Sequence, residues 1–104
     1  DNAEAIKEKK AVAYKNMPSM VRFNNHLKQR YGIDVDYYLD MLSKQNGLCK
    51  ICGGLSNRKR LSVDHCHETG RVRGLLCERC NSFIGRVKDD VSILKSAIDY
   101  LQNN

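Results

Sequence analysis

Residues 61–81, LSVDHCHETGRVRGLLCERCN, place several chemically active side chains close together along the chain. Asp64 and His65 are adjacent, and Asn81 closes the stretch. A carboxylate and an amide carbonyl are hard oxygen ligands, which suit Mg²⁺ or Mn²⁺. An imidazole suits a different task, because a neutral imidazole can take a proton from water near physiological pH. We therefore expect Asp64 and Asn81 to bind a catalytic divalent cation and His65 to act as a general base.

The chemistry that fits such a site is phosphodiester hydrolysis. The base would activate a water molecule for attack on phosphorus, and the cation would stabilise the charge that grows on the leaving oxygen. A structural interpretation stays open, because polar residues such as Asp64 and His65 often only cap turns. In that case the chain would be a non-catalytic, DNA-binding zinc module.

Four cysteines form two CxxC pairs: Cys49, Cys52, Cys77 and Cys80. Each pair can present two sulfur atoms to a tetrahedral Zn²⁺, and Gly53 and Gly54 allow the turn that the first pair needs. A disulfide or redox role remains the alternative, although the fifth cysteine leaves an odd count. We expect a structural zinc site. Four protein thiolates leave zinc no open position, so catalysis must come from other residues.

The charge of the chain points to a polyanionic partner. The 104 residues carry 18 Lys and Arg against 12 Asp and Glu, for a net charge of +6, which favours nucleic acid. Many basic residues surround the candidate site. Those expected to contact DNA phosphates are Arg58, Lys59, Arg60, Arg71 and Arg73.

A strand, strand, helix unit is expected to position the site. Residues 61–76 predict a two-stranded hairpin whose turn is HETGR, where Gly70 permits a positive φ. A helix carrying Phe83, Ile84 and Val87 follows the second cysteine pair, and Asn81 would lie in its first turn, facing the hairpin. One zinc would clamp both ends of this unit.

Further helices are expected on either side of this unit. Residues 2–16 favour a helix that Pro18 ends, and Ser19 would cap the next helix, which ends at Gly32. A third helix would run from near Asp34 to before Gly47. The last segment predicts a core helix capped by Asp89 or Asp90. Its apolar stripe is Leu94, Ala97, Ile98 and Leu101.

The length is that of one ordinary domain, of mainly helical α+β class. We expect residues 1–46 to form N-terminal helices available for dimerisation and DNA contact, and residues 47–104 to form the zinc-bound core with a C-terminal helix. The sequence contains no apolar run of about 18 residues and no secretory pattern at Asp1, so we expect an intracellular protein without a membrane partner.

The motif VDHCHETGRVRGLLCERCN, with CKICGG upstream, resembles the recombination endonuclease VII family of phages, a branch of the HNH or ββα-metal nucleases. The resemblance extends from Tyr31 to about Leu101. It implies a zinc-clamped ββα-metal (HNH) core and a metal-dependent DNA endonuclease, in an infected host or bacterial cytoplasm. His67 matches a family position linked to activity, through contact with the scissile phosphate.

The resemblance also implies an intertwined homodimer that acts on branched or junction DNA. A site-specific HNH nicking or homing enzyme is the alternative. The chain departs from the family pattern Asp-His-Asp-His at Cys66. We expect Cys66 to be a small buried filler, with an oxidation-sensitive switch or an accidental metal scavenger as other interpretations. His26 has no partner nearby in the sequence, and we assign it no role.

Overall fold

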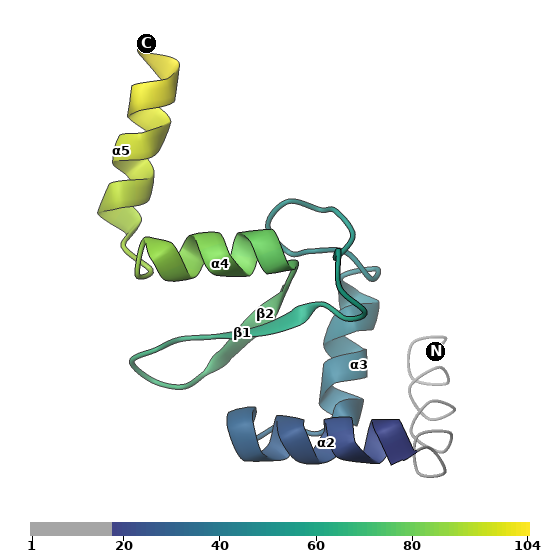
Figure 1. The fold of residues 1–104 in the computed structure, drawn as a ribbon. Helices are drawn as coiled ribbons and strands as arrows, with labels where there is room; N and C mark the ends of the chain where they lie inside the picture. The colour runs from purple at the N-terminus through teal and green to yellow at the C-terminus, as the bar shows by residue number, and fades with distance from the viewer. Residues whose placement is uncertain (1–17) are drawn as a thin grey trace.

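The computed structural model describes residues 18–104, and this part of the chain contains four helices and one two-stranded sheet (Figure 1). The elements are α2 (Pro18–Tyr31), α3 (Val35–Lys44), β1 (Ser62–His65), β2 (Val72–Leu76), α4 (Glu78–Arg86) and α5 (Val91–Gln102). About half of the described residues are helical, which confirms the α+β class. The helix predicted for residues 2–16 lies outside the described residues.

Strands β1 and β2 form the predicted antiparallel hairpin. Asp64 pairs with Gly74 but His65 pairs with Val72, so Arg73 is an extra residue, a bulge, in β2. The turn closes through hydrogen bonds from the Cys66 N–H to the Arg71 carbonyl (2.8 Å) and from the Gly70 N–H to the Cys66 carbonyl (2.7 Å). Gly70 has a φ of 76°, as the sequence predicts.

The helical boundaries follow local capping chemistry in α3 but not in α2. The Asp34 carboxylate accepts a hydrogen bond from the Tyr37 N–H (2.8 Å) and caps α3, as expected. The prediction that Ser19 caps α2 is wrong, because Pro18 and Ser19 are both helical. The fixed φ of proline is itself a helical value, so Pro18 can occupy the first turn.

The buried core joins the N-terminal helices to the hairpin. Its aliphatic and aromatic members are Leu27, Val35, Tyr38, Leu61, Val63, Leu75 and Leu76. The buried Asn24 side chain accepts a hydrogen bond from the Val35 N–H (2.8 Å) and ties α2 to α3. The Tyr38 hydroxyl donates to the Leu61 carbonyl (2.7 Å) and ties α3 to the start of the hairpin. The boundary predicted between residues 46 and 47 therefore falls within one shared core, and the division into two parts stays a prediction.

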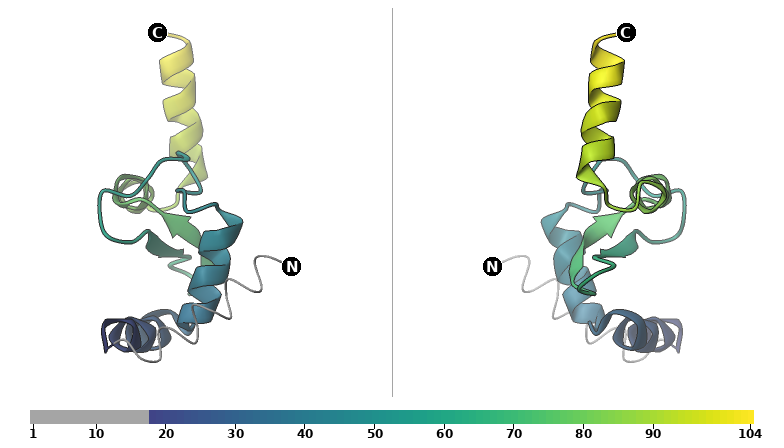
Figure 2. Two further views of the ribbon diagram at one scale, coloured as in Figure 1. Left: turned by 90° about the vertical axis from the view of Figure 1, so that its right-hand side faces the viewer. Right: turned by 90° about the vertical axis from the view of Figure 1, so that its left-hand side faces the viewer.

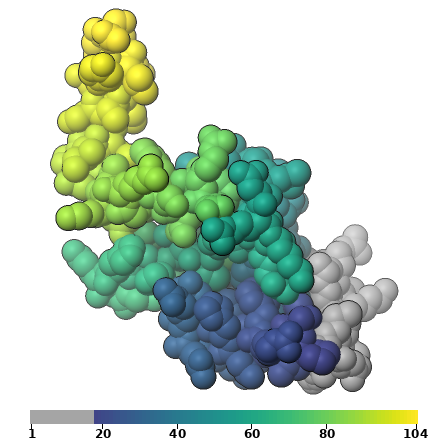
Figure 3. All heavy atoms as spheres, viewed as in Figure 1, coloured from purple at the N-terminus to yellow at the C-terminus, as the bar shows by residue number. Residues whose placement is uncertain are grey.

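Helix α5 forms where the sequence predicts it, with Asp90 as its cap, but it is not a core helix. Ile98 is 55% exposed and Leu101 is 74% exposed. The helix leaves the rest of the protein, as the ribbon views and the sphere view show (Figures 1, 2 and 3). The apolar stripe predicts that one side of α5 packs against another surface, and within residues 18–104 no element covers it. No helix of residues 18–104 is long and apolar enough to span a lipid bilayer.

The Tyr38 hydroxyl provides a test of the shared core. Burial raises the pKa of Tyr38 to about 12, so its hydroxyl remains a donor at physiological pH. Tyr38→Phe leaves the Leu61 carbonyl without this donor, and we expect the free energy of unfolding to fall by about 1–2 kcal/mol. Denaturant unfolding measures the change. Tyr37→Phe, at a half-exposed neighbour, is the control and should change little; equal effects of both variants would contradict the role of this bond.

Candidate active site and metal centre

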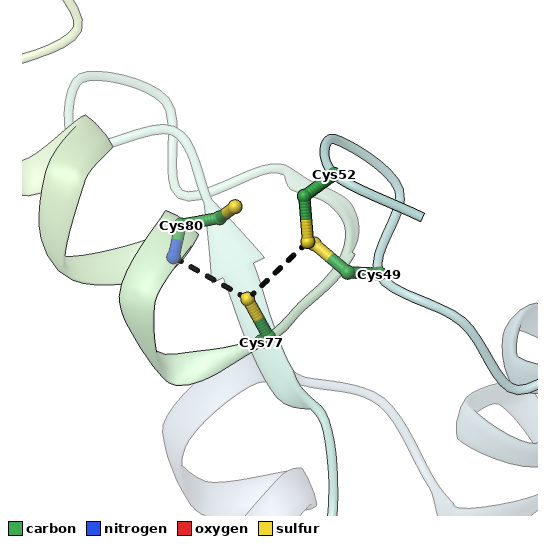
Figure 4. A group of neighbouring side chains, drawn as sticks. All are labelled: Cys49, Cys52, Cys77 and Cys80. Carbon is green, nitrogen blue, oxygen red and sulfur yellow. Dashed lines mark hydrogen bonds between the residues drawn. The ribbon is translucent and has the colours of Figure 1, made fainter. Parts of the chain in front are cut away.

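The four cysteines of the two CxxC pairs come together in space (Figure 4). Their sulfur atoms all lie within 4.8 Å of one another, and the sulfurs of Cys52 and Cys77 are 3.7 Å apart. A tetrahedral site with Zn–S bonds of about 2.3 Å has S–S edges of roughly 3.8 Å. All five cysteines of the chain are free thiols in this structure, so it shows no disulfide. The cluster is positioned to bind a metal ion, and its donor set favours zinc.

Backbone contacts with β2 and α4 place the cluster. The Lys50 N–H, between the first two cysteines, donates to the Leu75 carbonyl (3.1 Å). The Gln45 side chain also pairs with the backbone of Leu75, through bonds of 2.9 and 3.0 Å. Cys77 follows β2 directly and is the N-cap of α4, where its sulfur accepts from the Cys80 N–H (3.5 Å). The first pair is thereby fastened to the sheet edge and the second to the helix. The role of Gln45 has no sequence pattern and was not predicted.

The thiols of the cluster differ in acidity. Burial raises the pKa of Cys80 to about 12, and the neighbouring sulfurs of Cys77 and Cys52 add to the effect. Burial also acts to raise the pKa of Cys49, but hydrogen bonds from backbone N–H groups, chiefly that of Cys77, outweigh it and lower the pKa to about 6. One thiolate forms readily, and the last one resists ionisation. A bound cation would stabilise all four thiolates together.

Asp64, the predicted metal ligand, lies at the turn end of β1 and is paired with Arg73. The guanidinium donates from Nε to Oδ2 (2.7 Å) and from Nη2 to Oδ1 (3.0 Å). The bulge at Arg73 sets this contact, since the side chain of the extra residue reaches the carboxylate beside it. Arg73 also donates to Asp89 Oδ1 (3.1 Å). The carboxylates hold the pKa of Arg73 well above its usual range.

The two predicted catalytic histidines lie beside each other at the same end of the hairpin. The ring centroids of His65 and His67 are 5.0 Å apart, and that of His65 is 5.5 Å from Tyr31 on α2. His65 is half-buried and His67 is exposed. His67 Nδ1 is 3.3 Å from Asp89 Oδ2. The two histidines therefore lie side by side, and Asp64 is connected to His67 through Arg73 and Asp89.

Asn81 lies in the first turn of α4, as predicted, and is half-buried. Its N–H donates to the Cys77 carbonyl (2.9 Å), which sets its place relative to the cysteine cluster. Helix α4 packs against both strands of the hairpin (Figure 1). Coordination of one cation by both Asp64 and Asn81 stays a prediction.

The five basic residues expected to contact DNA differ in their surroundings. Arg58 donates to Glu78 (2.7 Å), and the guanidinium of Arg60 lies 4.2 Å from the centre of the Phe23 ring. Arg73 is paired with two carboxylates, as described above. Lys59 and Arg71 are exposed and form no ion pair with residues 18–104. These two are the most available for phosphate contact, and the role of all five stays a prediction.

Two features of the site depart from sequence reasoning. Asp89 joins the site, although the sequence marks it only as an alternative cap for α5; Asp90 is the cap, accepting from the Ser92 N–H (2.9 Å). Cys66 is not a buried filler, because it lies half-buried in the hairpin turn outside the core. Hydrogen bonds from Thr69 lower the pKa of the Cys66 thiol. A response of this thiol to oxidation stays a hypothesis.

Comparison with known proteins places this chain in a family. The family described as recombination endonuclease VII matches residues 24–103, which include all four clustered cysteines and Asp64, His65, His67 and Asn81. The chain belongs to the recombination endonuclease VII family. The resemblance noted in the sequence is therefore confirmed.

Two curated phage proteins are similar to this endonuclease VII family member. The gene 59 protein of Mycobacterium phage D29 is 43% identical over 91 residues, which are 86% of this chain and 55% of that protein. The gene 59 protein of Mycobacterium phage L5 is 40% identical over 92 residues, 86% of this chain and 56% of that protein. The chain thus spans about half the length of these relatives.

Removal of one cysteine tests the metal centre. Cys52→Ser deletes one of the four thiolates, and we expect the zinc content to fall from about one ion per chain toward zero, with a large loss of thermal stability. Elemental analysis and thermal unfolding measure the two effects. Cys66→Ser, a thiol outside the cluster, should keep full zinc content; equal zinc loss in both variants would rule out the assigned ligand set.

Proposed function

We propose that this protein is a metal-dependent endonuclease that hydrolyses phosphodiester bonds of DNA, and that β1, β2 and α4 form an HNH, or ββα-metal, core. The observation that carries the proposal is that Asp64, His65 and His67 lie at the turn end of a hairpin whose other end adjoins the four-cysteine cluster. Membership of an endonuclease family supports it. The relatives are phage proteins, which supports action inside an infected bacterium.

Each residue has a task in this proposal. His65 takes a proton from the attacking water, and the neighbouring rings of Tyr31 and His67 restrict its orientation. The exposed His67 contacts the scissile phosphate. Asp64 and Asn81 offer hard oxygen atoms that fit Mg²⁺ or Mn²⁺. Such a metal, when bound, stabilises charge on the leaving oxygen.

One observation favours a second candidate function. Arg73 engages both carboxylate oxygens of Asp64, which leaves neither oxygen without a partner. If this ion pair persisted on DNA, the protein would be a zinc-stabilised DNA-binding module without catalysis. Metal binding must compete with Arg73 for the nuclease proposal to hold.

A plasmid-nicking assay separates the two functions. Wild-type protein with Mg²⁺ or Mn²⁺ should nick supercoiled DNA, and His65→Ala should lower the rate by roughly 10²- to 10⁴-fold because the general base is lost. Asn81→Ala should also lower the rate, with an increased metal requirement. The exposed residues His26 and Asn25 supply matched controls, as His26→Ala and Asn25→Ala should nick normally. Intact plasmid with every protein, despite DNA binding, would support the binding module instead.

We further propose that two copies of the chain act together on branched or junction DNA, with the site-specific nicking or homing enzyme as the alternative. The resemblance to endonuclease VII supports paired action. The exposed apolar residues of α5 support a second copy as the partner that covers them. These residues are Val91, Ile93, Ile98, Tyr100 and Leu101.

Paired cleavage provides the test. We expect wild-type protein to sediment as a dimer and to cut a four-way junction with paired nicks, faster than a linear duplex of matched sequence. Ile98→Glu places a charge on the apolar side of α5 and should yield a monomer that makes single nicks. Ser96→Glu adds the same charge on another side of the helix and should remain dimeric. A wild-type monomer at working concentration, or equal rates on both substrates, would contradict this part of the proposal.

A further inference from the structure

Asp89 lies in the turn between α4 and α5 and makes two contacts with the candidate site. Its Oδ1 accepts a hydrogen bond from Arg73 Nη2 (3.1 Å), and its Oδ2 is 3.3 Å from His67 Nδ1. Its side chain is only 22% exposed. Each oxygen of the carboxylate therefore serves a different side chain of the hairpin.

The backbone at Asp89 is unusual. Lys88 and Asp89 have φ values of 53° and 58°, in the left-handed region that side chains other than glycine rarely adopt. Each such residue costs of order 1 kcal/mol or more, and such costs concentrate at functional sites. A hydrogen bond from the Asp89 N–H to the Ile84 carbonyl (3.2 Å) holds this conformation against the end of α4. The strained turn directs the Asp89 carboxylate toward the hairpin.

The contact with Asp89 defines which nitrogen of His67 carries hydrogen. The donation from Arg73 keeps Asp89 ionised, with its pKa below the usual value, and an ionised carboxylate has only acceptors. Nδ1 of His67 must then be the donor. Nε2 is the nitrogen left without this contact, and the 64% exposed side chain of His67 helps Arg73 and Asp89 to line a hollow of about 590 Å³. An exposed Nε2 can reach a DNA phosphate or a water molecule there.

We propose that Asp89 is a positioning residue of this active site: it accepts the Nδ1–H of His67, fixes the ring, and leaves Nε2 as the nitrogen that faces DNA. The proposal rests on the proposed nuclease function. The carboxylate acts through His67 and does not itself contact substrate. An acid that orients an imidazole in this way is a common means of setting a histidine tautomer.

Asp89→Asn tests the proposal with little disturbance of the backbone, because asparagine tolerates the left-handed region. Arg73 and His67 contact different oxygens of Asp89, and an amide keeps an acceptor at only one of those two positions, so it cannot accept from both partners in their present places. ¹⁵N NMR of the zinc-loaded protein reports the tautomer of each imidazole, and the chain has only three histidines. We expect His67 to carry hydrogen on Nδ1 in the wild type and to lose much of this population in Asp89→Asn. Cleavage of DNA should fall roughly 10- to 100-fold.

Asp90→Asn is the matched control. It removes the same charge one residue along, and asparagine still caps α5, so tautomer and cleavage should both match the wild type. A wild-type His67 with hydrogen only on Nε2, or an unchanged His67 spectrum in Asp89→Asn, would overturn the proposal. The wild-type spectrum needs no variant and remains decisive if Asp89→Asn is unstable. Absence of cleavage by the wild type would overturn the nuclease function instead, and the spectra would still decide whether Asp89 orients His67.

Discussion

The convergence of four sulfur atoms is the constraint on which this structure depends. Two come from the loop after α3 and two from the start of α4, and all lie within 4.8 Å. Cys49 and Cys77 are themselves part of a small buried core. A core of this size gains much from a metal cross-link, since metal binding contributes directly to folding free energy. Because Cys77 directly follows β2, caps α4 and supplies a sulfur, the cluster also determines how α4 lies on the hairpin.

Ion pairs and hydrogen bonds hold together the side chains at the turn end of the hairpin. Asp64, Arg73, Asp89 and His67 form a continuous network in which acidic groups alternate with basic ones. The members come from β1, β2, the hairpin turn and the turn after α4, so the network links four segments of the chain. It also keeps the carboxylates in defined orientations through contacts within the protein. The metal centre and this network thus fix opposite ends of the same two strands.

Local chemistry made much of the fold predictable. The CxxC spacing, the positive φ at Gly70 and the cap at Asp34 each depend on a few neighbouring residues, and the structure contains all three features. The sequence also predicts that Asp64, His65 and His67 lie toward the turn end of the hairpin, and the structure has them there. The partners of these residues were not predictable in the same way. Asp89 lies 22 positions from His67, and only the turn after α4 brings the two together.

The wrong prediction for α5 and the missed contact of Gln45 both concern long-range partners. The apolar stripe of α5 is real, but periodicity cannot state whether the covering surface belongs to the same chain. Gln45 pairs with Leu75 across 30 positions through a contact that no repeat encodes.

The extra residue in β2, Arg73, divides the hairpin into two sections. In each section side chains alternate between the two faces of the sheet, but the alternation does not continue across the bulge. On the zinc side, Val63 opposite Leu75 keeps the inward pattern that the core needs. On the turn side, the strand pairing is shifted by one residue at Arg73, so the alternation of side chains starts anew there. A change of position in the turn section, which carries His65 and His67, therefore need not disturb the register of the packed half of the hairpin.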